Sequence, residues 1–183
     1  DLGWDLRTQG LVLSSFYAGY LLMQIAGGRL ADRFGGKLVL GLGVLAWSLF
    51  TLVTPPAAFL GLGMLLLARV GMGLGEAVTF PSIYSLYARW VPVREKSQAI
   101  ALTMSGIPIG TVFALIVTPV LVQALGWAWA FYLFGAVGVL WYLAWQRLVT
   151  DDPARHPRIG AEERARLAAE APAAGTGAAP VPL

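Results

Sequence analysis

The stretch GRLADRFGGK, Gly28–Lys37, decides the fold: it is a short polar turn between two long apolar runs. Gly28 allows two helices to touch, and Gly35 with Gly36 permits a tight turn. Asp32 lies at a predicted helix terminus, where its carboxylate can accept hydrogen bonds from backbone donors or from a cation. The pattern therefore predicts two helices joined by a sharp basic turn. An ordinary positively charged turn with no further role is the alternative interpretation.

The apolar runs on either side of this turn are long enough to cross a membrane. Of the 183 residues, 57% are hydrophobic and 13% are charged, whereas soluble domains carry about 25% charged residues. A spanning helix needs about 20 mostly apolar residues, and five stretches qualify. They are Gly10–Leu30, Leu38–Thr54, Phe59–Ala88, Ala99–Leu125 and Trp127–Leu148. We expect an all-α membrane protein whose residues 10–150 form five transmembrane helices, the second of which ends at the helix breakers Pro55 and Pro56.

The composition excludes several other classes of protein. The chain has no cysteine and one histidine, His156, so we expect no metal site and no cofactor. It shows no Ser/His/Asp set and no phosphate-binding loop, so we do not expect an enzyme. The net charge of +3 does not indicate a nucleic-acid partner, because the cations gather at helix ends as they do in membrane proteins. We interpret His156 as solvated and the following tryptophans as interfacial anchors: Trp127, Trp129, Trp141 and Trp145.

The basic residues predict how the helices are oriented in the lipid bilayer. Eleven of the thirteen lie in or beside the loops that follow the first, third and fifth helices. The positive-inside rule then makes residues 1–9 an external loop and the tail after Leu148 cytoplasmic. Residues 151–171 are predicted to be a cytoplasmic amphipathic segment, and 172–183, rich in Ala, Pro and Gly, a disordered linker. We expect both ends to continue into a longer protein.

Two charged residues within the third helix are the most informative candidates for a site. Arg69 and Glu76 are seven positions apart, which places them within about 20° of one helix face and about 10 Å apart along the axis. Tyr84 falls near the same face. Charged residues inside a membrane usually face a polar cavity and mark ion or proton pathways, and a carboxylate there can change its protonation as its surroundings change. A structural charge network that fixes helix packing is the alternative. The small residues Gly71, Gly73 and Gly75 are expected to allow close helix packing.

Two sequence patterns resemble a known transporter family. The turn matches the Gly-x-x-x-Asp-Arg-x-Gly-x-Lys signature of the major facilitator superfamily, and the five helices resemble helices two to six of its N-terminal bundle. The stretch Arg69–Ser97, RVGMGLGEAVTFPSIYSLYARWVPVREKS, resembles the anion:cation symporters within that superfamily. This family includes sialin and the vesicular glutamate, sodium–phosphate, plastid phosphate and bacterial sugar-acid transporters. Ser14–Gly28, Gly126–Trp145 and Asp151–Ile159 look like the same family.

The resemblance implies roles for individual residues. Glu76 would be the ion-coupling carboxylate with Arg69 as its partner, and Tyr20 and Gln24 would line the central cavity together with Tyr84. The turn would be a gating latch rather than a substrate contact. Its candidate residues are Gly28, Asp32, Arg33, Gly35 and Lys37.

The resemblance also implies a function, which departures from the family pattern narrow. The chain would be a fragment of an H+- or Na+-coupled symporter of organic or inorganic anions such as phosphate, carboxylates or sugar acids. Its partners would be that anion, the coupling ion, the bilayer, and the first helix and C-terminal half of the same protein. Ala18, Ala77 and Lys96 depart from common family residues, and Leu13 replaces the histidine of vesicular glutamate transporters, which argues against glutamate. A major facilitator of sugars or drugs, or a truncated non-transporting membrane protein, is the alternative. The membrane would be a plasma or inner membrane, with a plastid or other organelle membrane as the alternative.

Overall fold

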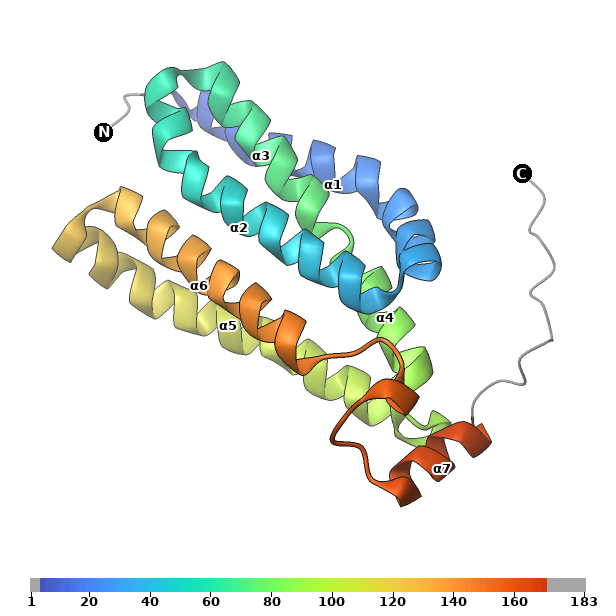
Figure 1. Cartoon of the computed structure of the whole chain (residues 1–183). Coiled ribbons are helices and arrows are strands. Elements are labelled where there is room, and N and C mark those ends of the chain that lie inside the picture. Colours follow the sequence, from blue (N-terminus) through green and yellow to red (C-terminus); the bar gives the residue numbers. More distant parts are fainter. Residues whose placement is uncertain (1–3, 171–183) are drawn as a thin grey trace.

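The structure, a computed structural model, describes residues 4–170 (Figure 1). Its helices are α1 (Leu6–Phe34), α2 (Gly36–Leu60), α3 (Leu62–Glu76), α4 (Thr79–Trp90), α5 (Lys96–Leu125), α6 (Trp127–Leu148) and α7 (Ala161–Glu170), with short 3-10 turns η1 (Val93–Glu95) and η2 (Pro153–Arg155). Five helical segments, with α3 and α4 counted as one, are long and apolar enough to cross a membrane, as the sequence predicts. The predicted linker 172–183, the last residue of the predicted amphipathic segment and residues 1–3 lie outside the described residues.

The second span does not end at its proline pair, and that expectation is wrong. α2 continues through Pro55 and Pro56 to Leu60 and stops at Gly61, whose φ is 122°. Proline removes a backbone donor, but inside a bundle neighbouring helices and Ser/Thr side chains can compensate for such a loss. Just before the pair, the Thr54 hydroxyl donates to the Phe50 carbonyl oxygen at 2.8 Å. Pro55 itself is almost fully buried, so packing around it holds the last turn of α2.

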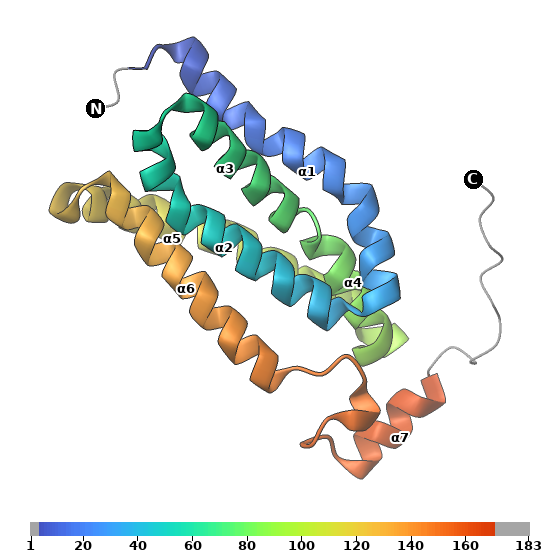
Figure 2. The ribbon, with the colours of Figure 1, turned by 45° about the horizontal axis from the view of Figure 1, so that its top comes forward.

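α3 lies between α1 and α2, and the contacts are made through glycine (Figure 2). A Cβ atom on Gly73 would lie 2.8 Å from the Tyr20 backbone nitrogen of α1. A Cβ atom on Gly75 would lie 2.9 Å from the Trp47 backbone nitrogen of α2. Both distances are shorter than an ordinary van der Waals contact, so only glycine lets the backbones approach this closely. The predicted close approach of backbones is therefore confirmed at Gly73 and Gly75, whereas Gly71 packs against the Phe50 ring.

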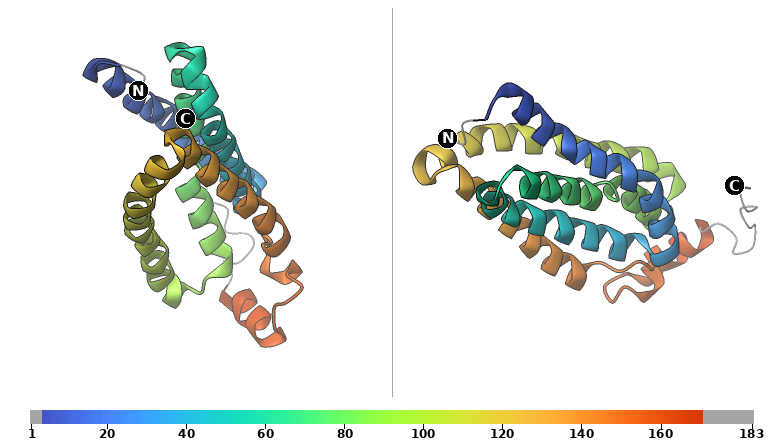
Figure 3. Two further views of the ribbon diagram at one scale, coloured as in Figure 1. Left: turned by 90° about the vertical axis from the view of Figure 1, so that its left-hand side faces the viewer. Right: turned by 90° about the horizontal axis from the view of Figure 1, so that it is seen from above.

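α6 continues the layer on the far side of α2, and α5 lies off this layer, to one side of it (Figure 3). Gly135 of α6 faces the Ser48 carbonyl oxygen of α2, 3.0 Å from where its Cβ would be. The buried Ser48 hydroxyl donates back to the Val44 carbonyl oxygen at 2.6 Å, which removes the cost of an unpaired polar group there. α5 packs mainly along α6, and none of its residues is buried (Figure 3).

The α1–α2 turn, the α4–α5 turn and residues 149–160 lie at one end of the bundle, here called the basic end. α7 packs at this end. Its Arg166 guanidinium forms an exposed ion pair with Glu95 of η1, with a nitrogen–oxygen distance of 2.7 Å. An exposed pair of this kind contributes little stability, on the order of 0–1 kcal/mol, so it sets where α7 lies more than how firmly the bundle folds.

Candidate functional site

The third span is interrupted near its middle, immediately after Glu76. α3 ends at this residue, and α4 begins at Thr79. Pro81 explains the interruption, because it has no N–H to donate to the carbonyl oxygen of Ala77, and its ring would collide with that oxygen. At the break, the Thr79 hydroxyl donates to the Glu76 carbonyl oxygen at 2.7 Å. The candidate carboxylate is thus attached to a helix end within a spanning segment, where transporters often bind ions and substrates.

Arg69, about two turns before the break, is half-buried and incompletely paired. Its guanidinium carbon lies 5.6 Å from the centroid of the Phe131 ring of α6, which is close enough for a cation–π attraction. One of its Nη atoms is 3.8 Å from the sulfur of Met72, a weak acceptor. Its buried Nε has no partner among the described residues. Arg69 therefore carries a buried hydrogen-bond donor that residues 4–170 leave unsatisfied.

The five candidate residues of the site come from three neighbouring elements, α1, α3 and α4, but the structure does not join them directly. Arg69 and Glu76 both lie on α3, as predicted, and within residues 4–170 no ion pair links them. Tyr20 of α1 is half-buried beside α3, at the close contact with Gly73. The side chains of Glu76, Gln24 and Tyr84 are exposed. No hydrogen bond between any two of the five is found in the part of the chain that the structure describes, so their meeting in one cavity stays a prediction.

The motif turn (Gly28–Lys37) has the predicted bend, but two of its expected contacts are not made among residues 4–170. Gly35 joins α1 to α2 with φ 91°, a conformation that glycine adopts without strain. Gly27 makes such a contact, since its Cβ would lie 3.1 Å from the Val78 side chain, whereas a Cβ at Gly28 would meet no atom of residues 4–170 within 4 Å. Asp32, in the last turn of α1, is exposed and has no hydrogen-bond or ion-pair partner among residues 4–170.

A residue far along the chain makes the hydrogen bond that was expected of Asp32. The Asp151 carboxylate accepts from the Lys37 backbone N–H at 2.8 Å. The Lys37 ammonium donates to the Gln146 carbonyl oxygen at 3.2 Å, and the Trp145 indole N–H donates to the Lys37 carbonyl oxygen at 3.0 Å. Trp145 is therefore more than an interfacial anchor. We call these three residues, Trp145, Gln146 and Asp151, the Lys37 clamp.

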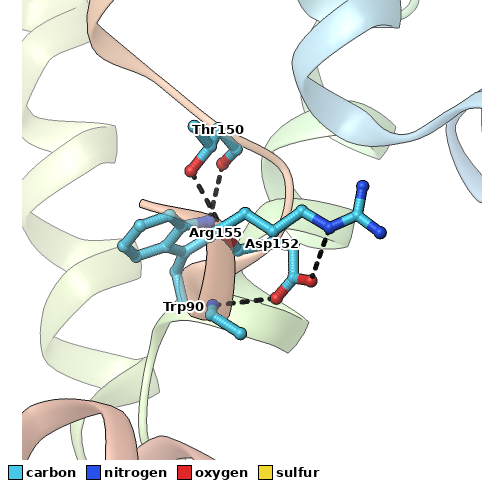
Figure 4. A network of polar contacts seen from close by, with 5 residues as sticks. Trp90, Thr150, Asp152 and Arg155 are labelled. Atoms are coloured by element: carbon cyan, nitrogen blue, oxygen red, sulfur yellow. Dashed lines mark hydrogen bonds and ion pairs between the residues drawn. The ribbon is translucent and has the colours of Figure 1, made fainter. Parts of the chain in front are cut away.

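The segment after α6 is also attached to α4 (Figure 4). The Trp90 indole N–H donates to the Thr150 carbonyl oxygen at 2.9 Å. Next to it, Asp152 accepts from the Ala154 N–H and pairs with Arg155, and so caps η2 locally. His156 packs edge-on against the Trp90 ring, with centroids 5.4 Å apart. The interpretation of His156 as merely solvated is therefore wrong.

Residues 1–181 match the family model described as Major Facilitator Superfamily. The chain belongs to the major facilitator superfamily. Within it, the chain is similar to curated relatives that are named for anion transport. It is 44% identical over 164 residues to the chloroplastic ascorbate transporter of Arabidopsis thaliana (90% of this chain, 30% of the relative). It is 45% identical over 168 residues to sodium-dependent phosphate transport protein 1, chloroplastic, of the same plant (92% and 33%). It is 42% identical over 161 residues to sialin of Homo sapiens (88% and 32%).

This major facilitator chain spans about a third of the length of these relatives. Its five apolar helices and its family make it a multi-pass membrane protein.

Sequence reasoning did not identify the helix break or the Lys37 clamp. Pro81 was a usable signal for the break, because a proline four residues after Ala77 removes that helical hydrogen bond. Nothing local indicated the clamp, since Asp151 and Lys37 are 114 positions apart.

Proposed function

We propose that this chain is part of a secondary active transporter that couples the movement of H+ or Na+ to that of a small anion. The observation that carries the proposal is the position of Glu76, a carboxylate at a helix break inside a spanning segment. A charged residue at the centre of a membrane helix costs about 3 kcal/mol on insertion scales, so a functional role is the natural reason to keep it. The relatives named for ascorbate and for sodium-dependent phosphate transport support an anion as substrate.

In this proposal Glu76 takes up and releases the coupling ion with Arg69 as its partner, and Arg69 also attracts the anion. Arg69 suits that role because its guanidinium is held by a ring and a sulfur, which leave N–H donors unused. Tyr20, Gln24 and Tyr84 would line the cavity. The anion would bind between this bundle and further helices of the same protein, near the middle of the membrane, and the two halves would rock around it.

The motif turn would bias the equilibrium between inward- and outward-open states. Its exposed Asp32 is free to contact a segment beyond this bundle. Arg33, Arg89 and Arg147, each in the last turn of its helix, place positive charge at the basic end. By the positive-inside rule this end would be cytoplasmic, with α7, and residues 1–9 would be external.

The test is uptake of candidate anions by the full-length transporter that contains this chain, reconstituted in proteoliposomes. Phosphate, ascorbate, a sugar acid and glutamate would be compared, each with and without an inward H+ or Na+ gradient. Glu76→Gln keeps the size of the side chain and removes its ability to ionise. Glu162→Gln, on the exposed surface of α7, is the matched control.

We expect Glu76→Gln to abolish gradient-driven accumulation while exchange of internal for external anion continues. Exchange needs the anion site but no net movement of the coupling ion, so it separates coupling from binding. Glu162→Gln should behave as wild type. Gradient-driven uptake that survives in Glu76→Gln would leave this residue with a structural role and refute the coupling assignment.

A further inference from the structure

The N-terminus of α2 lacks a capping side chain of its own. Its N-cap residue is Gly35, which makes no side-chain hydrogen bond to the first turn. The N–H groups at the start of a helix have no acceptor within the helix and need one from elsewhere. Lys37 is the second residue of α2, and its N–H donates to the Asp151 carboxylate. A carboxylate is well suited to this position, both as an acceptor and as a negative charge near the positive end of the helix dipole.

The fit between Asp151 and the motif turn is close. A Cβ atom on Gly35 would lie 2.6 Å from Asp151 Oδ2, so a side chain at position 35 would push the carboxylate away. The other two members of the Lys37 clamp hold the carbonyl oxygen and the ammonium of the same lysine. All three polar groups of Lys37 are therefore bound by residues 145–151.

The segment that carries Asp151 is itself fixed on its other side. The Trp90 indole holds the Thr150 carbonyl oxygen, and the ring of His156 packs against Trp90. His156 Nε2 is also 3.3 Å from the Leu148 carbonyl oxygen at the end of α6. The segment thus joins the start of α2 to the end of α4, the helix that begins three residues after Glu76.

We propose that Asp151 is a positioning residue for the motif turn: it caps α2 from the end of α6 and holds the turn with Asp32 exposed. The gating part of this inference rests on the proposed function, whereas the capping part does not. Asp151 contacts neither anion nor coupling ion in this scheme. It acts by fixing the geometry from which Asp32 reaches its partner, so it should affect the rate of the conformational change and not the affinity for the anion.

Hydrogen–deuterium exchange of the full-length protein tests the cap directly. Because the Lys37 amide has no acceptor within α2, its protection depends on Asp151. Asp151→Ala should accelerate exchange of the amides at 36–38 by about fivefold, as expected for loss of a helix cap. Asp151→Asn should stay close to wild type, because asparagine caps as well as aspartate does. Asp152→Ala is the matched control, since the neighbouring carboxylate caps η2 and not α2.

Anion uptake by the same variants then tests the positioning role. We expect Asp151→Ala to lower the maximal uptake rate severalfold at unchanged KM, and Asp151→Asn to restore that rate. Equal exchange in Asp151→Ala and Asp152→Ala would overturn the cap, and faster exchange with an unchanged uptake rate would overturn its role in gating. If Asp151→Ala does not fold, Trp145→Phe can be used, because it removes only the hydrogen bond from the indole N–H to the Lys37 carbonyl oxygen. It should accelerate exchange of the same amides. Lack of uptake by the wild type would refute the proposed function, and the exchange comparison would still decide the cap.

Discussion

Replacing Gly73 with alanine should destabilise the bundle, because this glycine lies where α1 and α3 are closest. An added Cβ would come within 2.8 Å of the Tyr20 backbone nitrogen and closer still to the Phe16 carbonyl oxygen, whereas ordinary contact begins at 3.4 Å. The two helices would have to separate by at least about 0.6 Å, since neither obstructing atom belongs to a flexible side chain. Overpacking of this kind costs about 1–3 kcal/mol of unfolding free energy, partly offset by the roughly 1 kcal/mol by which alanine favours a helix over glycine.

The assay is thermal or denaturant unfolding of the full-length protein in detergent, followed by tryptophan fluorescence. Gly106→Ala is the matched control, because the same methyl group on α5 would meet nothing within 4 Å. It should leave stability unchanged or raise it by up to about 1 kcal/mol through helix propensity. If Gly73→Ala proves as stable as Gly106→Ala, the close packing of α1 on α3 is refuted.

Two further predictions concern the candidate site and the start of α1. Phe131→Leu should weaken anion binding severalfold, because Arg69 loses a cation–π attraction of about 0.5–2 kcal/mol. Phe131→Tyr keeps an aromatic ring and should bind the anion as the wild type does. Equal KM values for Phe131→Leu and Phe131→Tyr would contradict the role of this ring in holding Arg69. Hydrogen bonding to the Thr8 side chain and backbone lowers the pKa of Asp5 below its ordinary value of 3.8. The cap that Asp5 provides is therefore complete above pH 3.8 and is lost as the pH falls through the lowered pKa. Amide exchange at Thr8, corrected for intrinsic rates, should rise in that acidic range in the wild type and stay flat in Asp5→Ala.

The features that sequence predicted well depend on local patterns. Five apolar stretches of spanning length gave the five spans, and a separation of seven residues placed Arg69 and Glu76 on one helix. Gly73 and Gly75 were correctly predicted to make close helix contacts, because small residues in spanning helices commonly allow neighbouring backbones to approach. The family, too, followed from contiguous residues in the motif turn and in Arg69–Ser97.

The features that sequence missed depend on contacts between distant residues. Gly27 and Gly28 are indistinguishable in the sequence, and only the direction of α3 decides which of them faces Val78. The acceptor for the start of α2 came from Asp151, beyond the last span, and not from the nearby Asp32. Pro55 and Pro56 resemble a helix end, but the packing around Pro55 outweighs their local preference.

α5 can report on neighbours that lie outside this bundle, because few residues of this chain contact it. Its 30 residues include none that is buried, and its glycines at 106 and 110 face open space. Substitutions over most of its surface should therefore disturb no contact within residues 4–170. In a mutational scan of the full-length protein, any position on α5 that tolerates only small or only polar residues would mark a neighbour that residues 4–170 do not supply. The pattern of intolerance along this helix would map that neighbour's surface.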